Sequence, residues 1–285
     1  MRLYAVVAFA VAAVAVGALG FLVEVPSPTP YSPFNTGPSG YSALASYLGA
    51  EPLTSVGGFN GSLIVPFTHY LSDDELRALA GFVAGGGRLV IVDEGGYSNA
   101  LLTDYLNLSL VVVPVPVYDY VLNYGGNASI ALINASVGDV AISCYFGLTA
   151  SASLSGSSVG VLANSSSLSF RDIDGNGFFS PGDQFGPFPV VAGGGVGGGS
   201  VYVVTDLDAF SNGLIDLGNN SALARYLVGG GPIGIYLGGL NTSLIDYVKL
   251  YARAAGGWVG DAAELGSLLV IAVVVIYGRR YGVLE

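Results

Sequence analysis

The sequence of 285 residues has only one cysteine, one histidine and few charged residues. A single cysteine, Cys144, excludes an internal disulfide and a cysteine-rich zinc site. The 20 acidic residues outnumber the 9 basic ones, so the net charge is −11. An acidic surface repels phosphate backbones, and we therefore expect no nucleic-acid partner. The 44 glycines follow no collagen-like period, which predicts a globular chain with many turns.

Two apolar segments lie near the ends of the chain. Residues 3–23 carry no charge and are long enough to cross a ~30 Å hydrocarbon layer, although a cleaved signal peptide is an alternative. Residues 265–277 are shorter, but Arg279 and Arg280 follow directly, which favours a membrane segment over a buried core helix. We predict an anchor or signal peptide at 1–24, a proline-rich linker at 25–34, a transmembrane helix at 262–280 and a cytoplasmic tail at 281–285.

Sites for N-glycosylation lie only between these two segments. Chance placement of the 13 Asn and 36 Ser or Thr gives roughly 1.6 Asn-x-Ser/Thr sequons, against seven observed. The seven are at Asn60, Asn107, Asn127, Asn134, Asn164, Asn219 and Asn241. We therefore predict an exported, glycosylated domain over residues 35–255. It is anchored in the membrane, and both termini of the chain lie in the cytoplasm.

The predicted domain alternates strand-like and helix-like segments. Short connections between a strand, a helix and the next strand predict a parallel sheet with right-handed crossovers. Residues 110–170 have no long helical period and predict antiparallel strands that are inserted into this core or packed beside it. We expect strands at 62–67, 88–92, 201–206 and 233–237, and helices after an N-cap at Ser39, after a capping box at Ser72–Glu75, at 221–228 and at 243–253.

Three short motifs resemble those of a known family. They are Asn35-x-Gly-Pro-Ser-Gly, a Leu-Ser-x-x-Glu helix that ends in Gly-Gly-Gly-Arg-Leu-Val-Ile, and Asp206-x-x-x-Phe-x-Asn212. In this order they resemble the uncharacterised domain-of-unknown-function family 4350, over most of residues 32–255. The resemblance implies a class I glutamine amidotransferase-like, flavodoxin-like α/β fold. The expected fold is thus a mostly parallel sheet with an inserted antiparallel β region, flanked by N- and C-terminal transmembrane helices.

The residues that amidotransferase chemistry requires are missing. That reaction needs a nucleophilic cysteine with a histidine base. The turn where the nucleophile would lie reads Asp93-Glu94-Gly95-Gly96. Cys144 lies in an apolar run and is predicted to be a small core residue, and His69 precedes the capping box as a loop residue. We therefore expect a non-catalytic domain.

An Asp-rich segment at 172–183 matches the calcium-loop pattern D-x-[DN]-x-[DN]-G-x₅-E, with Asp in place of the final Glu. Oxygen atoms at positions 1, 3, 5, 7, 9 and 12 would surround Ca²⁺, and glycine at position 6 permits the turn. The predicted ligands are Asp172, Asp174, Asn176, the carbonyl of Phe178, Ser180 or a water, and Asp183. A metal-free turn is the alternative.

Polar residues also follow the predicted parallel strands, at the edge where open α/β sheets bind ligands. The candidates for a ligand pocket are Asn35, Ser39, Asp93, Glu94, Asp206 and Asn212. Helix capping and turn formation are the alternative explanation and the favoured one.

Three functions are consistent with these observations. The leading hypothesis is a membrane-held extracellular accessory or binding domain with a structural calcium loop, which associates with a membrane-protein partner. The alternatives are an extracellular hydrolase that acts through carboxylates and a structural protein of the cell envelope.

Overall fold

The computed structural model describes residues 11, 14–15, 17–18, 20–155 and 159–254. The chain divides into two compact units. Residues 29–241 form one unit, and residues 1–28 with 242–285 form the other. All strands of the described residues belong to the first unit.

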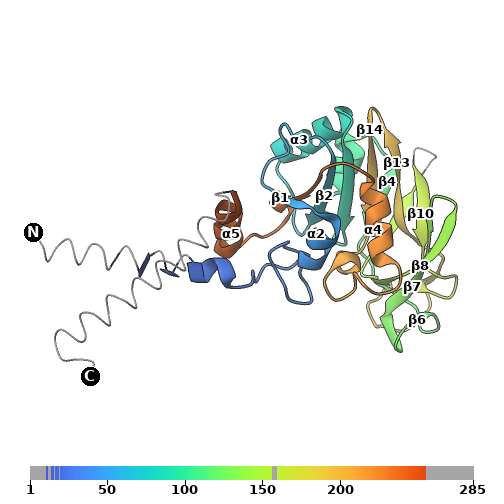
Figure 1. The fold of residues 1–285 in the computed structure, drawn as a ribbon. Coiled ribbons are helices and arrows are strands. Elements are labelled where there is room, and N and C mark those ends of the chain that lie inside the picture. The colour runs from blue at the N-terminus through green and yellow to red at the C-terminus, as the bar shows by residue number, and fades with distance from the viewer. Residues whose placement is uncertain (1–10, 12–13, 16, 19, 156–158, 255–285) are drawn as a thin grey trace, which may run out of the picture. The chain divides into compact units, whose positions relative to one another are not determined.

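Ten of the described strands form one mixed sheet (Figure 1). Five strands at one side pair in parallel, and the strands beyond them pair in antiparallel fashion. In spatial order they are β1 (Glu51–Leu53), β15 (Ile233–Tyr236), β2 (Ser62–Phe67), β3 (Arg88–Asp93), β14 (Gly199–Val204), β13 (Pro189–Val196), β10 (Gly160–Asn164), β7 (Asn127–Val137) and β6 (Asn123–Tyr124), and β8 (Val140–Gly147) pairs with β7.

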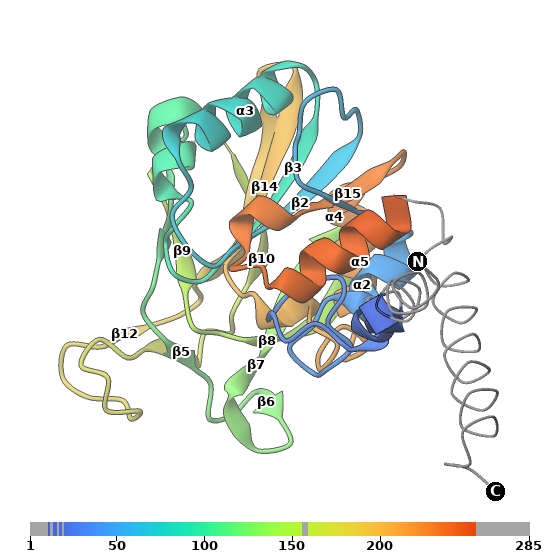
Figure 2. The same cartoon turned by 90° about the vertical axis from the view of Figure 1, so that its left-hand side faces the viewer.

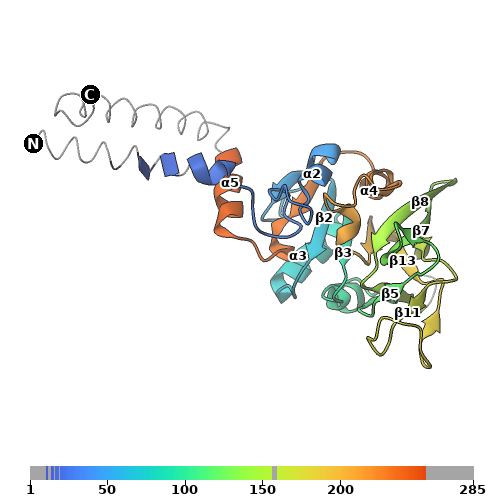
Figure 3. The same cartoon turned by 90° about the horizontal axis from the view of Figure 1, so that it is seen from below.

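Helices cover both faces of the parallel strands. Figure 3 shows α3 on one side of β2 and β3, with α2 and α4 on the other. Of the described helices, the α-helices are α2 (Ser42–Leu48), α3 (Asp73–Ala84), α4 (Asn220–Val228) and α5 (Leu244–Ala254). The shorter ones are the π-helix η1 (Leu101–Tyr105) and the 3₁₀ helices η2 (Asp208–Phe210) and η3 (Leu237–Gly239). Because both faces are covered, β2 and β3 are apolar throughout apart from their ends.

Alternate side chains of these strands enter two separate apolar clusters. Leu63 and Ile91 pack in the cluster that contains α3, whereas Ile64 and Val90 pack in the cluster that contains α2 and α4. The capping box predicted for α3 is present: the Ser72 side chain accepts the Glu75 N–H and Glu75 accepts the Ser72 N–H. This box fixes the start of α3 and therefore the position of its apolar face.

Two smaller sheets complete the first unit. β4 (Leu110–Val113) pairs with β9 (Ser151–Leu154). β11 (Phe170–Arg171) lies between β5 (Val117–Tyr118) and β12 (Gln184–Phe185). Figure 2 shows β5, β12 and β6 at the end of the unit remote from α3.

The expected fold class was wrong. Five strand pairings of the main sheet are antiparallel, between β14 and β13, β13 and β10, β10 and β7, β7 and β6, and β7 and β8, so the sheet is mixed rather than mostly parallel. Four strands of the region predicted to be inserted into the core or packed beside it, β6, β7, β8 and β10, continue this same sheet. Alternating apolar residues predict a strand but do not identify its neighbour, which is why the sequence did not reveal the continuous sheet.

The expected flanking transmembrane helices are not part of the described structure. Across the described residues, no helix is both long enough and apolar enough to span a bilayer. The predicted segment at 262–280 lies outside the described residues, as does much of the segment at 1–24. In this second unit, residues 20–24 are helical and the Lys249 ammonium donates to the Val23 carbonyl.

Ser39 does not cap the first helix of the sheet unit. α2 begins at Ser42, and no side chain of its own N-cap residue, Tyr41, bonds to the helix. Instead the Asn212 Oδ1 accepts the Ala43 N–H at 2.8 Å. The acceptor that α2 needs thus comes from a residue 169 positions away, which local sequence signals do not reveal.

Asn220 joins β8 to η2 and to the segment that precedes α4. Its side chain is fully buried; Oδ1 accepts the Tyr145 N–H at 2.9 Å, and Nδ2 donates to the carbonyls of Tyr145, Ala209 and Leu214. A buried amide with this many partners leaves several unsatisfied backbone groups when it is removed.

We expect Asn220→Ala to lower the free energy of unfolding by about 2–4 kcal/mol, because the Tyr145 N–H and three carbonyls lose their partner. Urea unfolding followed by circular dichroism measures the change. In protein produced without N-linked glycans, Asn219→Ala is the matched control, since Asn219 is exposed and its side chain makes one bond, to the Ser143 carbonyl. Equal losses in the two variants would contradict this account.

Candidate functional site

A cavity of about 430 Å³ lies at the carboxyl edge of the parallel strands. The parallel register places Phe67 of β2 beside Asp93 of β3, and Val92 of β3 beside Val204 of β14. The residues that follow these three strands therefore meet, and Thr68, Glu94 and Leu207 all line the cavity. We call this cavity the strand-edge pocket.

Glu94 supplies the carboxylate of the strand-edge pocket. Its Oε2 accepts the Thr149 hydroxyl at 2.9 Å, and its carboxylate also accepts the Leu207 N–H. Burial raises the pKa of Glu94, and the charge of Asp208 raises it further, against the lowering effect of the two hydrogen bonds. Glu94 is thus held in place by two donors and has no basic partner among the residues that line the pocket.

Asp206 lies behind the pocket and has no exposed surface. Its Oδ2 accepts the Gly147 N–H at 2.8 Å and its Oδ1 accepts the Asp208 N–H at 3.0 Å. Burial, followed by the charges of Asp208 and Glu94, raises the pKa of Asp206 to about 8. Both oxygens are engaged by backbone amides, so Asp206 holds the turn after β14 and does not line the pocket.

Tyr31 forms a wall of the pocket and has a left-handed backbone, with φ of 59°. Its hydroxyl bonds to the Asp208 side chain, and burial followed by the Asp208 charge raises the Tyr31 pKa. Its ring packs edge-on against Tyr41, with 5.5 Å between centroids, and the Tyr41 hydroxyl donates to the Leu207 carbonyl at 2.6 Å. A positive φ in a residue with a side chain is strained and is often found at functional sites.

The other predicted ligand residues lie outside the pocket lining. Asp93 is fully buried and accepts the N–H groups of Gly95 and Ser98 and the Ser98 hydroxyl, so it holds the turn after β3. Asn212 Nδ2 donates to the carbonyls of Asn35 and Gly37. These residues shape the loops around the pocket, as the capping alternative expects.

Asn35 and Ser39 belong to the same loop. Asn35 Nδ2 donates to the Thr29 carbonyl at 2.9 Å, which fixes the segment before Tyr31, and Ser39 is exposed. Of the six predicted ligand residues, Glu94 lines the pocket and Asp206 lies behind it. Sequence reasoning missed Tyr31, because it lies within the stretch expected to be a proline-rich linker, and Thr149, which follows β8 with no motif around it.

The Asp-rich segment forms a compact loop in which Asp172, Asp174 and Asp183 each offer an oxygen within 4.8 Å of the others. Two oxygens bound to one Ca²⁺ at 2.3–2.6 Å lie at most about 5 Å apart, so the three carboxylates fit one ion in size. Ser180 Oγ donates to both Asp174 and Asp183 and lies between them.

Hydrogen bonds already engage these carboxylates. Asp172 accepts the N–H groups of Gly175, Asn176 and Gly177, and Asp183 accepts that of Ile173. Asn176 Oδ1 accepts the Phe178 N–H instead of pointing to a shared centre. Calcium binding therefore stays a prediction, and a turn held by Asp side chains also accounts for these bonds.

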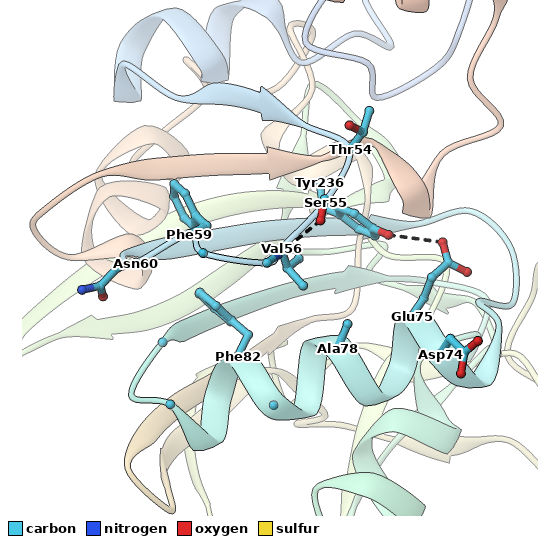
Figure 4. A pocket seen from close by; sticks show the side chains of 15 residues that line it. Thr54, Ser55, Val56, Phe59, Asn60, Asp74, Glu75, Ala78, Phe82 and Tyr236 are labelled. Atoms are coloured by element: carbon cyan, nitrogen blue, oxygen red, sulfur yellow. Dashed lines mark hydrogen bonds between the residues drawn. The ribbon is translucent and has the colours of Figure 1, made fainter.

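A larger cavity of about 690 Å³ runs between α3 and the loop after β1. Figure 4 shows the Tyr236 hydroxyl facing Glu75 at one end and Phe59 and Phe82 at the other. Glu75 serves the capping box of α3 and accepts the Tyr236 hydroxyl at 3.2 Å, and Asp74 pairs with Arg77. Because its acids are committed to α3, we favour the smaller strand-edge pocket as the functional site.

Cys144 lies in β8 and is fully buried, and burial raises the pKa of its thiol to about 12. A thiol held in its protonated form is a poor nucleophile. Cys144 is therefore a core residue, in agreement with the sequence-based interpretation.

The sequence model of the family DUF4350, described as a domain of unknown function, matches residues 33–228 of this chain. None of the curated proteins matches the sequence. Among solved structures, a polyextremophilic β-galactosidase from the haloarchaeon Halorubrum lacusprofundi is 18% identical, with a TM-score of 0.40 over 66% of this chain and 26% of that one. An exo-β-1,4-mannosidase from Opitutaceae bacterium strain TAV5 is 15% identical, with a TM-score of 0.34 over 62% and 26%. The chain thus spans about a quarter of the length of these two structures.

We expect the Asp-rich loop to bind Ca²⁺ with a dissociation constant of roughly 0.1–1 mM, as extracellular calcium modules do. Calorimetric titration of the full chain in a non-ionic detergent with CaCl₂ measures the binding. Asp172→Asn combined with Asp174→Asn removes two carboxylates and should abolish it. Asp139→Asn, at an exposed turn, is the control that should leave it unchanged.

Absence of binding in the unaltered chain would contradict the prediction, as would equal binding in the double variant. Either result reduces the loop to a turn held by hydrogen bonds.

Proposed function

The chain belongs to the DUF4350 family, and we propose that it is a non-catalytic domain that binds a small polar ligand in the strand-edge pocket. The observation that carries the proposal is the arrangement of Glu94, whose carboxylate faces a cavity of about 430 Å³ while Thr149 and Leu207 fix its position. Cavities of ~300–1,000 Å³ with few, well-held polar groups are typical of small-molecule sites.

The positions of the acids argue against the carboxylate-dependent hydrolase. Such an enzyme needs two carboxyl groups that both reach the substrate. Asp93 and Asp206 have no exposed surface, and backbone amides engage both of them. Glu94 is the acidic residue that lines the pocket, so a two-carboxylate mechanism has no second member there.

The proposed location is outside the cell, with the domain held at a membrane. Six of the seven sequon asparagines are exposed and Asn164 is half-buried, which agrees with attachment of glycans. The apolar sequence at 3–23 supports attachment to a membrane. As an accessory domain the protein would work with a membrane-protein partner, and recovery of the protein alone from mild detergent would count against an obligatory partner.

The Asp-rich loop has a supporting role in this proposal. The carboxylates of Asp172, Asp174 and Asp183 join the segment after β11 to the segment before β12. An ion bound there would stiffen this loop, which is joined to the strand-edge pocket by the Asp172 N–H that donates to the Pro116 carbonyl. The motif in the sequence and the size of the carboxylate cluster support Ca²⁺ as the ion.

We expect compounds that bind the strand-edge pocket to raise the melting temperature of the full chain in detergent, since a ligand that binds the folded state stabilises it. A panel of small polar metabolites, measured by thermal shift, identifies them. Glu94→Gln and Thr149→Val should each reduce the shift, because the first removes the carboxylate charge and the second removes its donor. Glu51→Gln, an exposed acid of β1, should leave it unchanged.

The proposal fails if no compound of the panel stabilises the chain. It also fails if every stabilising compound acts equally on the Glu94→Gln variant, because binding would then take place elsewhere.

Glycosylation gives a separate test of location. Protein isolated from its native membrane fraction should lose apparent mass on treatment with an enzyme that removes N-linked glycans, and Asn→Gln at the exposed sites should mimic this loss. The second measurement adds protease to sealed vesicles whose extracellular face points outward. If the mass is unchanged and the domain resists the protease, the domain lies on the cytoplasmic side of the membrane.

A further inference from the structure

The strand-edge pocket combines one carboxylate with aromatic walls. Glu94 lines it together with Tyr31 and Tyr97, and neither Lys, Arg nor His is among the lining residues of the described structure. We propose that the ligand of this pocket is a small organic cation, whose ammonium group binds between the Glu94 carboxylate and the rings of Tyr31 and Tyr97. This inference rests on the proposed function and names the class of ligand.

The acidic groups around Glu94 favour the binding of a cation. Asp208 and Asp206 lie close enough to raise the pKa of their neighbours, and the groups that bond to Glu94 are a neutral hydroxyl and a backbone N–H. A carboxylate in a partly buried site without a basic partner gains from an incoming positive charge. The net charge of −11 favours the approach of the same kind of ligand.

The walls of the pocket favour an ammonium group over an anion or a neutral molecule. Tyrosine rings attract cations through their negative faces, within about 6 Å of the ring centroid. Tyr97 is held by an edge-on contact with Tyr70, with 5.0 Å between centroids, and Tyr31 is held by Asp208 and Tyr41. Both rings are therefore positioned before a ligand arrives.

A metal ion fits the pocket less well than an organic cation. Divalent ions need several converging oxygen ligands. Among the described residues, carboxylates that converge in this way are Asp172, Asp174 and Asp183, at the other site. Behind the strand-edge pocket, both oxygens of Asp206 already accept backbone N–H groups, and in its lining Pro114 and Pro116 add apolar surface.

The test compares two probes of the same shape and different charge. Choline and 3,3-dimethylbutan-1-ol differ in a quaternary nitrogen that is replaced by carbon. Calorimetric titration of the full chain in a non-ionic detergent measures the affinity for each probe. Choline should bind at least about tenfold tighter than the neutral alcohol, and so should ethanolamine, which serves as a primary-amine probe. Binding should strengthen as the pH rises from 5 to 8, because the carboxylate must lose its proton.

Three variants locate the binding. Glu94→Gln should weaken it by about tenfold or more, Tyr97→Leu by severalfold, and Tyr97→Phe, which keeps the ring, should retain it. Glu51→Gln is the control for a general change in charge. Melting temperatures show whether each variant is folded.

Equal affinity for choline and the neutral alcohol overturns the inference, and so does binding that persists in a folded Glu94→Gln variant. If neither ammonium probe binds while a neutral compound of the panel does, the class of ligand is wrong and the proposed function stands. If no compound binds, both fail.

Discussion

The parallel pairing of β3 with β14 is the constraint on which the site depends. It joins segments more than a hundred residues apart, with Arg88 beside Ser200 and Val92 beside Val204. The turn after β3 carries Glu94, and the turn after β14 carries Asp206, Leu207 and Asp208. Parallel strands end at the same edge of a sheet, so the carboxyl groups of Glu94, Asp206 and Asp208 are brought together. The same pairing brings the Leu207 N–H to the Glu94 carboxylate. Without this pairing neither the pocket nor its charge would form.

Concentrating acids at one edge is unfavourable, and the surrounding backbone offsets part of this. Asp93 and Asp206 each accept at least two backbone N–H groups, which stabilise a buried carboxylate. Asn212 and Asn220 hold the neighbouring loops through their side-chain amides. Glu94 and Asp208 are less deeply buried, and the aromatic side chain of Tyr31 stands beside them. The acids that shape the site and the acid that faces the cavity are therefore different residues.

The sequence identified the elements with strong local signals and missed what depends on distant contacts. The runs at 62–67 and 88–92 became β2 and β3, and the Ser72 capping box marks the start of α3. The hairpin between β13 and β14 turns at Gly197 and Gly198, where Val196 pairs with Gly199. Two errors have a physical cause. An alternating pattern cannot say which strand is the neighbour, and the cap of α2 comes from Asn212, far along the chain. Glu94 was found because it follows a buried strand, whereas Tyr31 carries no such signal.

The pH dependence of stability in a Glu94→Gln variant tests this account most directly. A carboxyl group whose pKa is raised by folding stabilises the folded state fully below its unfolded pKa, and this contribution is lost as the pH rises through the folded pKa. For Asp206 the window runs from about 4 to about 8. Because the pKa of Glu94 is itself raised, Glu94→Gln changes this loss even without an interaction, and the test therefore also uses Asp206→Asn and the double variant. If β3 brings Glu94 next to Asp206, urea unfolding should show that the changes made by the two single variants across this window do not add up to the change in the double variant. Additive changes would mean that the two carboxyl groups do not interact, and would contradict the arrangement of the site.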